Sequence, residues 1–138
     1  MHRNPNRPMS PHLTIWKWGP HMLVSILGRV TGAGLAVVGG VLFVWWLTAA
    51  ASGPEAYQGF LDLVTVDSGA LNIAGYVLGV GLTWAFFQHT LGGLRHLVMD
   101  IGAGFELSSN KFWASVTVAA SLLLTALLWA WILLGRGA

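Results

Sequence analysis

The feature that most constrains the fold is a run of 22 residues without a charged side chain, from Val30 to Ala51. A helix of this length measures about 33 Å, enough to cross the roughly 30 Å hydrocarbon core of a bilayer. A second uncharged run covers Phe112 to Leu134, and a long apolar run begins near Gly69. We therefore predict an all-α integral membrane protein.

The composition favours the same compartment. Of the 138 residues, 55% are hydrophobic and only 9% are charged, whereas about a quarter of the residues in a soluble domain are charged. Seven Lys and Arg against five acids are too few for a nucleic-acid-binding surface. With no cysteine, the chain cannot itself supply ligands for an iron–sulfur cluster. Any redox metal here must be held by His or Met.

We predict a single membrane domain, 1–138, with three transmembrane helices at about 22–51, 69–98 and 112–134. A short basic arm, 1–21, precedes them and carries Arg3, Arg7 and Lys17. The segment from Ser52 to Ser68 is predicted to be a polar connection that turns at Gly53-Pro54. Ser68 or Asp67 is the expected N-cap of the second helix.

The positions of the basic residues predict the topology. The arm is basic, the first connection has no Lys or Arg, and Arg95 and Lys111 border the second connection. Because basic residues favour the cytoplasmic side, we expect the N-terminus and the second connection in the cytoplasm. Three spans then place the C-terminus on the outer side.

The segment QHTLGGLRHLVMDIG, residues 88–102, concentrates the chemically active side chains of the second helix. At about 100° per residue, His89, Gly93, His96 and Asp100 fall on one narrow stripe. Gly92 and Gly93 remove side-chain bulk near His89, which suits a flat prosthetic group such as haem. From the spacing alone a hydrogen-bonded structural histidine is favoured, because one His does not make a haem site by itself. His12 and His21 are expected to have surface or capping roles.

In the first helix, Ser25 and Arg29 are one turn apart and face the same way. Gly32, Ala36 and Gly40 continue that side as a strip of small residues, which allows close approach by another helix or a ring system. An Arg near hydrocarbon is costly unless it is paired or reaches the interface. Arg29 is therefore either a functional cation or an interfacial side chain.

Two motifs carry a family resemblance. HTLGGLRHLVMDIG resembles the His-x-x-x-Gly-x-Arg-His-x-x-x-Asp motif of the cytochrome b subunit of succinate dehydrogenase. The arm RPMSPHLTIW followed by SILGRVTG is similar to that family's Arg-Pro arm and its Ser-x-x-His-Arg start of the first helix. The motifs occur in the expected order, and the resemblance covers nearly the whole chain.

The resemblance implies roles for individual residues. His89 matches the axial ligand of one haem b, whose other ligand comes from a second membrane subunit. Ser25 and Arg29 match residues lining the ubiquinone pocket. Arg95, His96 and Asp100 match the end of the motif, near the haem propionates or the subunit interface. Arg29 is also expected at a haem propionate or at that interface. Gly28 departs from the pattern, because the family usually has a His before the Arg of the first helix.

The implied protein is a membrane anchor that binds haem b and helps to form the ubiquinone-reduction site. It would hold the flavoprotein and iron–sulfur subunits and would not itself be the dehydrogenase. With no import sequence ahead of the arm, we expect a multi-pass protein of the bacterial inner membrane. The alternative is a structural anchor of a related fumarate or quinone oxidoreductase, without a functional haem.

Overall fold

The computed structural model describes Asn6, Leu13 and residues 17–135, so most of the predicted arm, including His12, lies outside the described residues. The described chain is helical, as predicted for an all-α protein. Its elements are α1 (Pro20–Gly34), the π-helical η1 (Leu35–Gly39), α2 (Gly40–Ser52), α3 (Pro54–Val64), α4 (Ile73–Asp100) and α5 (Leu107–Gly135).

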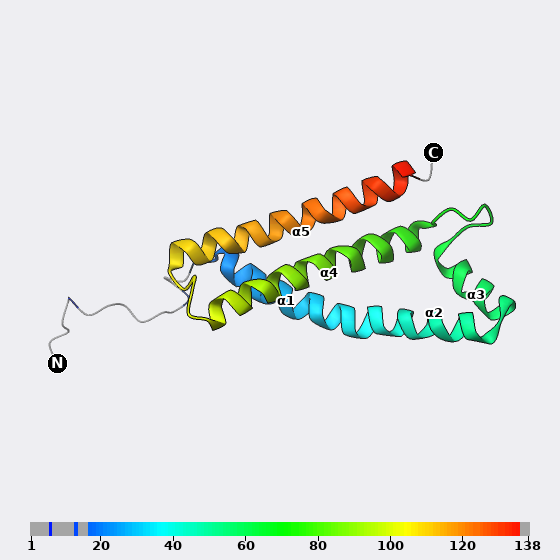
Figure 1. The fold of residues 1–138 in the computed structure, drawn as a ribbon, viewed down its shortest axis with the longest axis horizontal. Coiled ribbons are helices and arrows are strands. Elements are labelled where there is room, and N and C mark those ends of the chain that lie inside the picture. Colours follow the sequence, from blue (N-terminus) through cyan, green and yellow to red (C-terminus); the bar gives the residue numbers. More distant parts are fainter. Residues whose placement is uncertain (1–5, 7–12, 14–16, 136–138) are drawn as a thin grey trace.

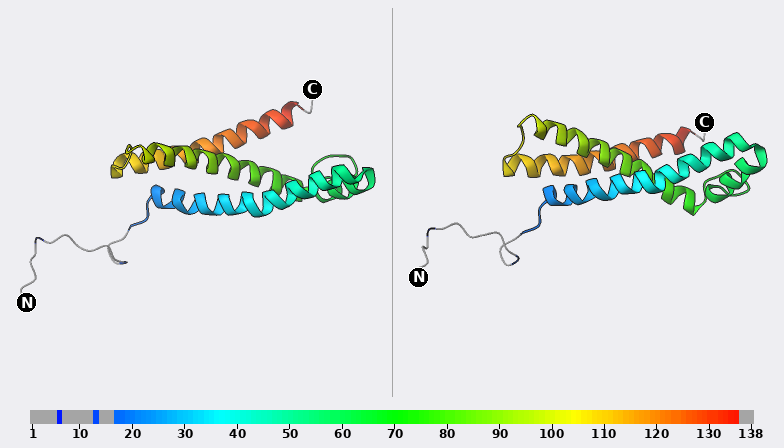
Figure 2. Two further views of the ribbon diagram at one scale, coloured as in Figure 1. Left: turned by 60° about the horizontal axis from the view of Figure 1, so that its bottom comes forward. Right: turned by 90° about the horizontal axis from the view of Figure 1, so that it is seen from below.

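Three long helical segments run side by side, each antiparallel to the next in the chain (Figure 1). The first consists of α1, η1 and α2 in direct succession, and the others are α4 and α5. Helices α1, α4 and α5 contact one another in all three pairings. The start of α1, the end of α4 and the start of α5 therefore lie at the same end of the bundle, which we call the α4–α5 end (Figures 1 and 2).

Within the described residues, two helices are long and apolar enough to cross a membrane, Pro20–Ser52 and Leu107–Gly135. The third predicted span corresponds to α4, which has 28 residues and a length of about 42 Å. Its length suffices, but its last 13 residues, 88–100, carry Gln88, two histidines, Arg95 and Asp100. Its role as a third span stays a prediction.

The helices pack through small and polar side chains, which is typical of helices in a bilayer. The buried face of α5 consists of Ala114, Thr117, Ser121 and Thr125. A Cβ on Gly79 of α4 would lie 2.7 Å from the Trp129 ring of α5, so the absence of a side chain at this position lets the ring pack against α4. Large apolar side chains instead point outward along all three long segments, where lipid or partner subunits would cover them.

The predicted polar connection after Ser52 is wrong in its structure, because most of it forms α3. Pro54 at the first helical position and Glu55 in the first turn suit a helix start. Tyr57, Phe60, Leu61 and Val64 follow at helical spacing. Phe60 packs edge-on against Trp45 of α2, with ring centroids 5.3 Å apart.

The start of the second long helix also differs from the prediction. Helix α4 begins at Ile73, and its N-cap is Asn72, whose side chain accepts a hydrogen bond of 2.8 Å from the Gly75 backbone. Asn72 also donates to the Leu63 carbonyl at 3.0 Å, so it joins the end of α3 to α4. At the other end, Gly102 adopts a φ of 86°, which ends α4 near the predicted position.

Candidate functional site

His89 lies on α4 where this helix crosses α1. Its Nδ1 is 3.1 Å from the Gly28 carbonyl oxygen and 3.3 Å from the Thr31 hydroxyl oxygen, both on α1. Thr31 is buried, whereas the residue His89 as a whole is exposed. The imidazole is thus held along one edge by the first helix. Within the described part of the chain, no hydrogen bond involves its Nε2.

The glycine that makes room for this imidazole is Gly32, across the helix interface. A Cβ on Gly32 would lie 2.8 Å from Cε1 of His89, too close for a real contact. Gly92 and Gly93, which the sequence singled out, have nothing within 4 Å of a built Cβ. The spacing along one helix indicated cleared space near His89, but it could not indicate the glycine supplied by another helix.

The predicted small-residue strip on the first helix lies against α4 at Gly32, and close approach by another helix or a ring system further along stays a prediction. Ala36 is exposed, and Gly40 has nothing within 4 Å of a built Cβ. Gly39 instead meets Leu82 of α4. The reason is η1: its π-helical turns do not advance by 100° per residue, so a face extrapolated from α1 does not continue through it.

Ser25 and Arg29 both lie on α1, in the half that belongs to the α4–α5 end, and both are exposed. They are four residues apart and therefore share a face. Within the described residues, neither has a hydrogen bond or an ion pair. Among the described residues, this hydroxyl and this guanidinium are therefore exposed without a polar partner.

The three other predicted residues, at the end of α4, point in two directions. His96 and Asp100 are exposed and lie on the same stripe as His89. Arg95 instead turns toward α5, where its Nη2 donates to the Asn110 Oδ1 at 2.7 Å. The structure therefore separates Arg95 from His89, and a contact of Arg95 with a haem propionate stays a prediction.

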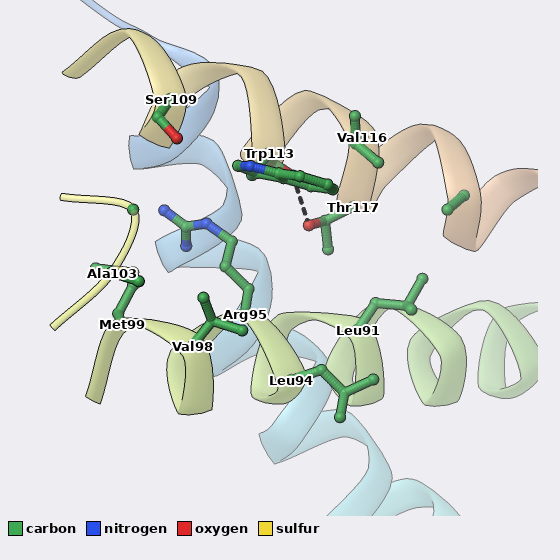
Figure 3. Close-up of a pocket in the computed structure, with 12 residues that line it drawn as sticks. Leu91, Leu94, Arg95, Val98, Met99, Ala103, Ser109, Trp113, Val116 and Thr117 are labelled. Carbon is green, nitrogen blue, oxygen red and sulfur yellow. Dashed lines mark hydrogen bonds between the residues drawn. The ribbon is translucent and has the colours of Figure 1, made fainter. Parts of the chain in front are cut away.

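Arg95 reaches into a pocket of about 410 Å³ between α4 and α5 (Figure 3). Its other lining residues are mainly apolar, including Leu91, Leu94 and Val98 from α4 and Trp113 from α5. Figure 3 shows the guanidinium between the two helices, close to the loop that joins them. This pocket could not be predicted from the sequence, because it depends on how α4 packs against α5, which the spacing within either helix does not determine.

The side chains around His89 fit a haem. A neutral imidazole with one nitrogen free of hydrogen bonds is a common axial ligand, and His89 has an exposed ring held at its other nitrogen. The described residues contain no group of three or more His, Cys, Asp or Glu that could hold a metal ion. The described residues therefore contain no complete set of metal ligands supplied by this chain alone.

Comparisons with known proteins identify the family. The family model described as succinate dehydrogenase/fumarate reductase transmembrane subunit matches residues 3–128. The chain belongs to this family. The match spans the arm motif, the first-helix motif and all six predicted site residues, so the predicted resemblance to the cytochrome b subunit of succinate dehydrogenase is confirmed.

Individual relatives within the family cover almost the whole chain. The succinate dehydrogenase cytochrome b556 subunit of Paracoccus denitrificans is 36% identical over 122 residues, which make up 88% of each chain. The b556 subunit of Rickettsia conorii is 36% identical over 127 residues, covering 89% of this chain and 90% of the relative. The mitochondrial b560 subunit of Mus musculus is 37% identical over 111 residues, or 80% and 61% of the two chains.

Membership of this family makes the chain a membrane subunit of the succinate dehydrogenase type. Gly28 contacts His89 through its backbone carbonyl, 3.1 Å from Nδ1, and a Cβ built at Gly28 meets nothing within 4 Å.

Proposed function

We propose that the chain is the haem b-binding membrane-anchor subunit of a bacterial succinate dehydrogenase. It helps to form the site where ubiquinone is reduced, and it holds the iron–sulfur and flavoprotein subunits at the inner membrane. The names of its relatives, which are cytochrome b subunits of succinate dehydrogenase, support this proposal.

The observation that carries the proposal is the environment of His89. A histidine in the interior of an apolar helix is normally buried or fully hydrogen-bonded, yet this residue is exposed and, among the described residues, has hydrogen-bond contacts at Nδ1 alone. Its other side needs a partner. We propose that His89 is one axial ligand of a single haem b and that a second membrane subunit supplies the other. When bound, the haem would accept and return one electron at a time.

Ser25 and Arg29 are proposed to bind ubiquinone. A quinone carbonyl that gains electrons becomes more negative, so a hydroxyl donor and a fixed cation beside it favour reduction. Both side chains are exposed on one face of α1. Arg29 is suited to this task because a guanidinium remains charged and orients several donors in one plane.

The α4–α5 end is proposed to face the cytoplasm and the iron–sulfur subunit. Arg29, Arg95 and Lys111 belong to this end, and basic residues favour the cytoplasmic side. His96 and Asp100 are exposed there and would meet the haem propionates or the partner subunit. Arg95, bonded to Asn110, would shape the interface by holding α4 against α5.

An optical difference spectrum tests the proposal. Membranes containing this chain together with its partner subunits should show a b-type haem band, and membranes lacking the second membrane subunit should not. A complex that oxidises succinate but has no such band would favour the alternative, a structural anchor without a functional haem.

A further inference from the structure

We propose that the first helix positions the haem ligand. In this inference, the Gly28 carbonyl and the Thr31 hydroxyl hold His89 in the tautomer that carries its proton on Nδ1, and Gly32 sets the place of the ring. Thr31 and Gly32 are thereby assigned as positioning residues. The inference rests on the proposed role of His89 as an axial ligand.

The chemistry of the two contacts determines the tautomer. A carbonyl oxygen can only accept, so the contact of 3.1 Å between Nδ1 and the Gly28 oxygen requires a proton on Nδ1. The Thr31 hydroxyl donates its own hydrogen to the Leu27 carbonyl at 2.6 Å. Its oxygen therefore has a lone pair free to accept from Nδ1, 3.3 Å away.

A proton on Nδ1 leaves the lone pair of neutral His89 on Nε2, the atom that would bind iron. An accepted Nδ1–H bond also makes the imidazole a more basic ligand. A more basic ligand favours the oxidised iron and lowers the reduction potential of the haem. Thr31, which is 2% exposed, thus acts on the haem through His89.

Gly32 controls where the ring can lie. A methyl group there would lie 2.8 Å from Cε1 and 3.3 Å from Nδ1 of His89. An alanine at this position could be tolerated only if the imidazole moved, because a side-chain ring yields more easily than a helix. Movement of the ring would lengthen the Nδ1 contacts and displace Nε2 together with them.

The first test is Thr31→Val in the assembled four-subunit complex. Valine keeps the shape of threonine but cannot accept from Nδ1, so a redox titration should give a higher haem midpoint potential. Thr31→Ser keeps the hydroxyl, so this variant should have the haem midpoint potential of the original complex. The matched control is Thr48→Val, since Thr48 also donates to the carbonyl four residues before it but is exposed on α2.

The second test is Gly32→Ala, with Gly34→Ala as control, because a Cβ on Gly34 meets nothing within 4 Å. Loss of such a supporting contact typically weakens metal binding about 10- to 100-fold. Gly32→Ala should therefore purify with less haem and show an altered low-spin signal by electron paramagnetic resonance. Gly34→Ala should match the original complex in both measurements.

The outcomes separate this inference from the proposed function. A haem band that survives His89→Ala would overturn the ligand assignment itself. A band that His89→Ala abolishes, together with an unchanged potential in Thr31→Val and full haem content in Gly32→Ala, would overturn only the positioning role. Co-purification of all four subunits establishes assembly, and if Thr31→Val does not assemble, the Gly32 pair decides.

Discussion

The imidazole of His89 is held by atoms of two kinds, a backbone carbonyl and a side-chain hydroxyl. A mutation at position 28 leaves the carbonyl in place, whereas a mutation at Thr31 removes its acceptor. A substitution can therefore remove the hydrogen-bond acceptor at position 31 but not the one at position 28.

The first prediction concerns the haem ligand. His89→Ala should remove the b-type band from the purified complex, because alanine has no atom that can bind iron. His21→Ala is the control, since His21 lies at the start of α1 and has no proposed role. The measurement is the reduced-minus-oxidised spectrum, and an unaltered band in His89→Ala would contradict the assignment.

The second prediction concerns ubiquinone. Ser25→Ala or Arg29→Leu should slow quinone reduction on the order of ten- to a hundredfold, because a lost charge-assisted hydrogen bond costs about 1.5–3 kcal/mol. Arg29→Lys should also be impaired, since an ammonium does not reproduce the guanidinium geometry. Succinate oxidation by an artificial acceptor should hardly change.

The control for this pair is Ser115→Ala, which removes an exposed hydroxyl that bonds within its own helix. Both activities are measured on fully assembled complex, so that a loss of subunits is not mistaken for a loss of quinone binding. Normal quinone reduction in both site variants would leave the chain as an anchor only.

For individual residues, the sequence was enough to select His89 as a candidate ligand. It also placed His89 on one stripe with His96 and Asp100, because helical spacing is regular. The same spacing puts Arg95 about 120° away from His89, which agrees with its turn toward Asn110. Thr31 and Gly32 could not be predicted as neighbours of His89. Their contact depends on how two helices cross, which spacing within one helix does not determine.

Among the elements, α4 and α5 are joined by a fully buried hydrogen bond between side chains. Ser121 of α5 donates to the Gln88 Oε1 of α4 at 2.8 Å, and both residues are fully buried. Gln88 directly precedes His89 in the chain. The contact therefore links the stability of the helix pair to the part of α4 that carries the proposed ligand.

The third prediction tests this contact. Ser121→Ala should destabilise the subunit by about 0.5–2 kcal/mol, the range found for hydrogen bonds between membrane helices. Thermal unfolding in detergent measures the change, again with Ser115→Ala as the control. If Ser121→Ala still lowers the stability in a Gln88→Leu background, the effect does not arise from the bond between them.

The long helices were predictable because an uncharged run of more than 20 residues has few other stable structures in a membrane. Helix α3 was not, because Gly53-Pro54 and three acids suggested a polar loop. The apolar residues of α3 recur at helical spacing and would have predicted a helix. The turn residues and the acids were given more weight. Because α3 was predicted as a loop, the start of α4 was also misplaced, and its N-cap was predicted at Ser68 or Asp67 where the structure has Asn72.

For the molecule as a whole, the antiparallel arrangement brings residues from α1 and from the end of α4 to one end of the bundle (Figure 1). Of the three predicted spans, α1–α2 and α5 have the length and composition to cross a membrane. The proposed orientation rests on the positions of the basic residues and is the subject of the fourth prediction.

Single cysteines, introduced into a chain that has none, should report the topology in intact cells. A membrane-impermeant reagent should label a cysteine in α3, for example in Gln58→Cys, because Gln58 is exposed. It should not label Ala103→Cys, in the connection between α4 and α5. Labelling of Ala103→Cys but not of Gln58→Cys would reverse the proposed orientation.

The contact between His89 and the first helix also sets an order of events during synthesis. The carbonyl of Gly28 and the imidazole of His89 are 61 residues apart in the chain, so the ligand cannot be oriented until the second long helix has emerged and paired with the first. Cofactor capture then has to follow helix pairing. A ribosome-bound chain that stops before α4 would have no prepared ligand to offer.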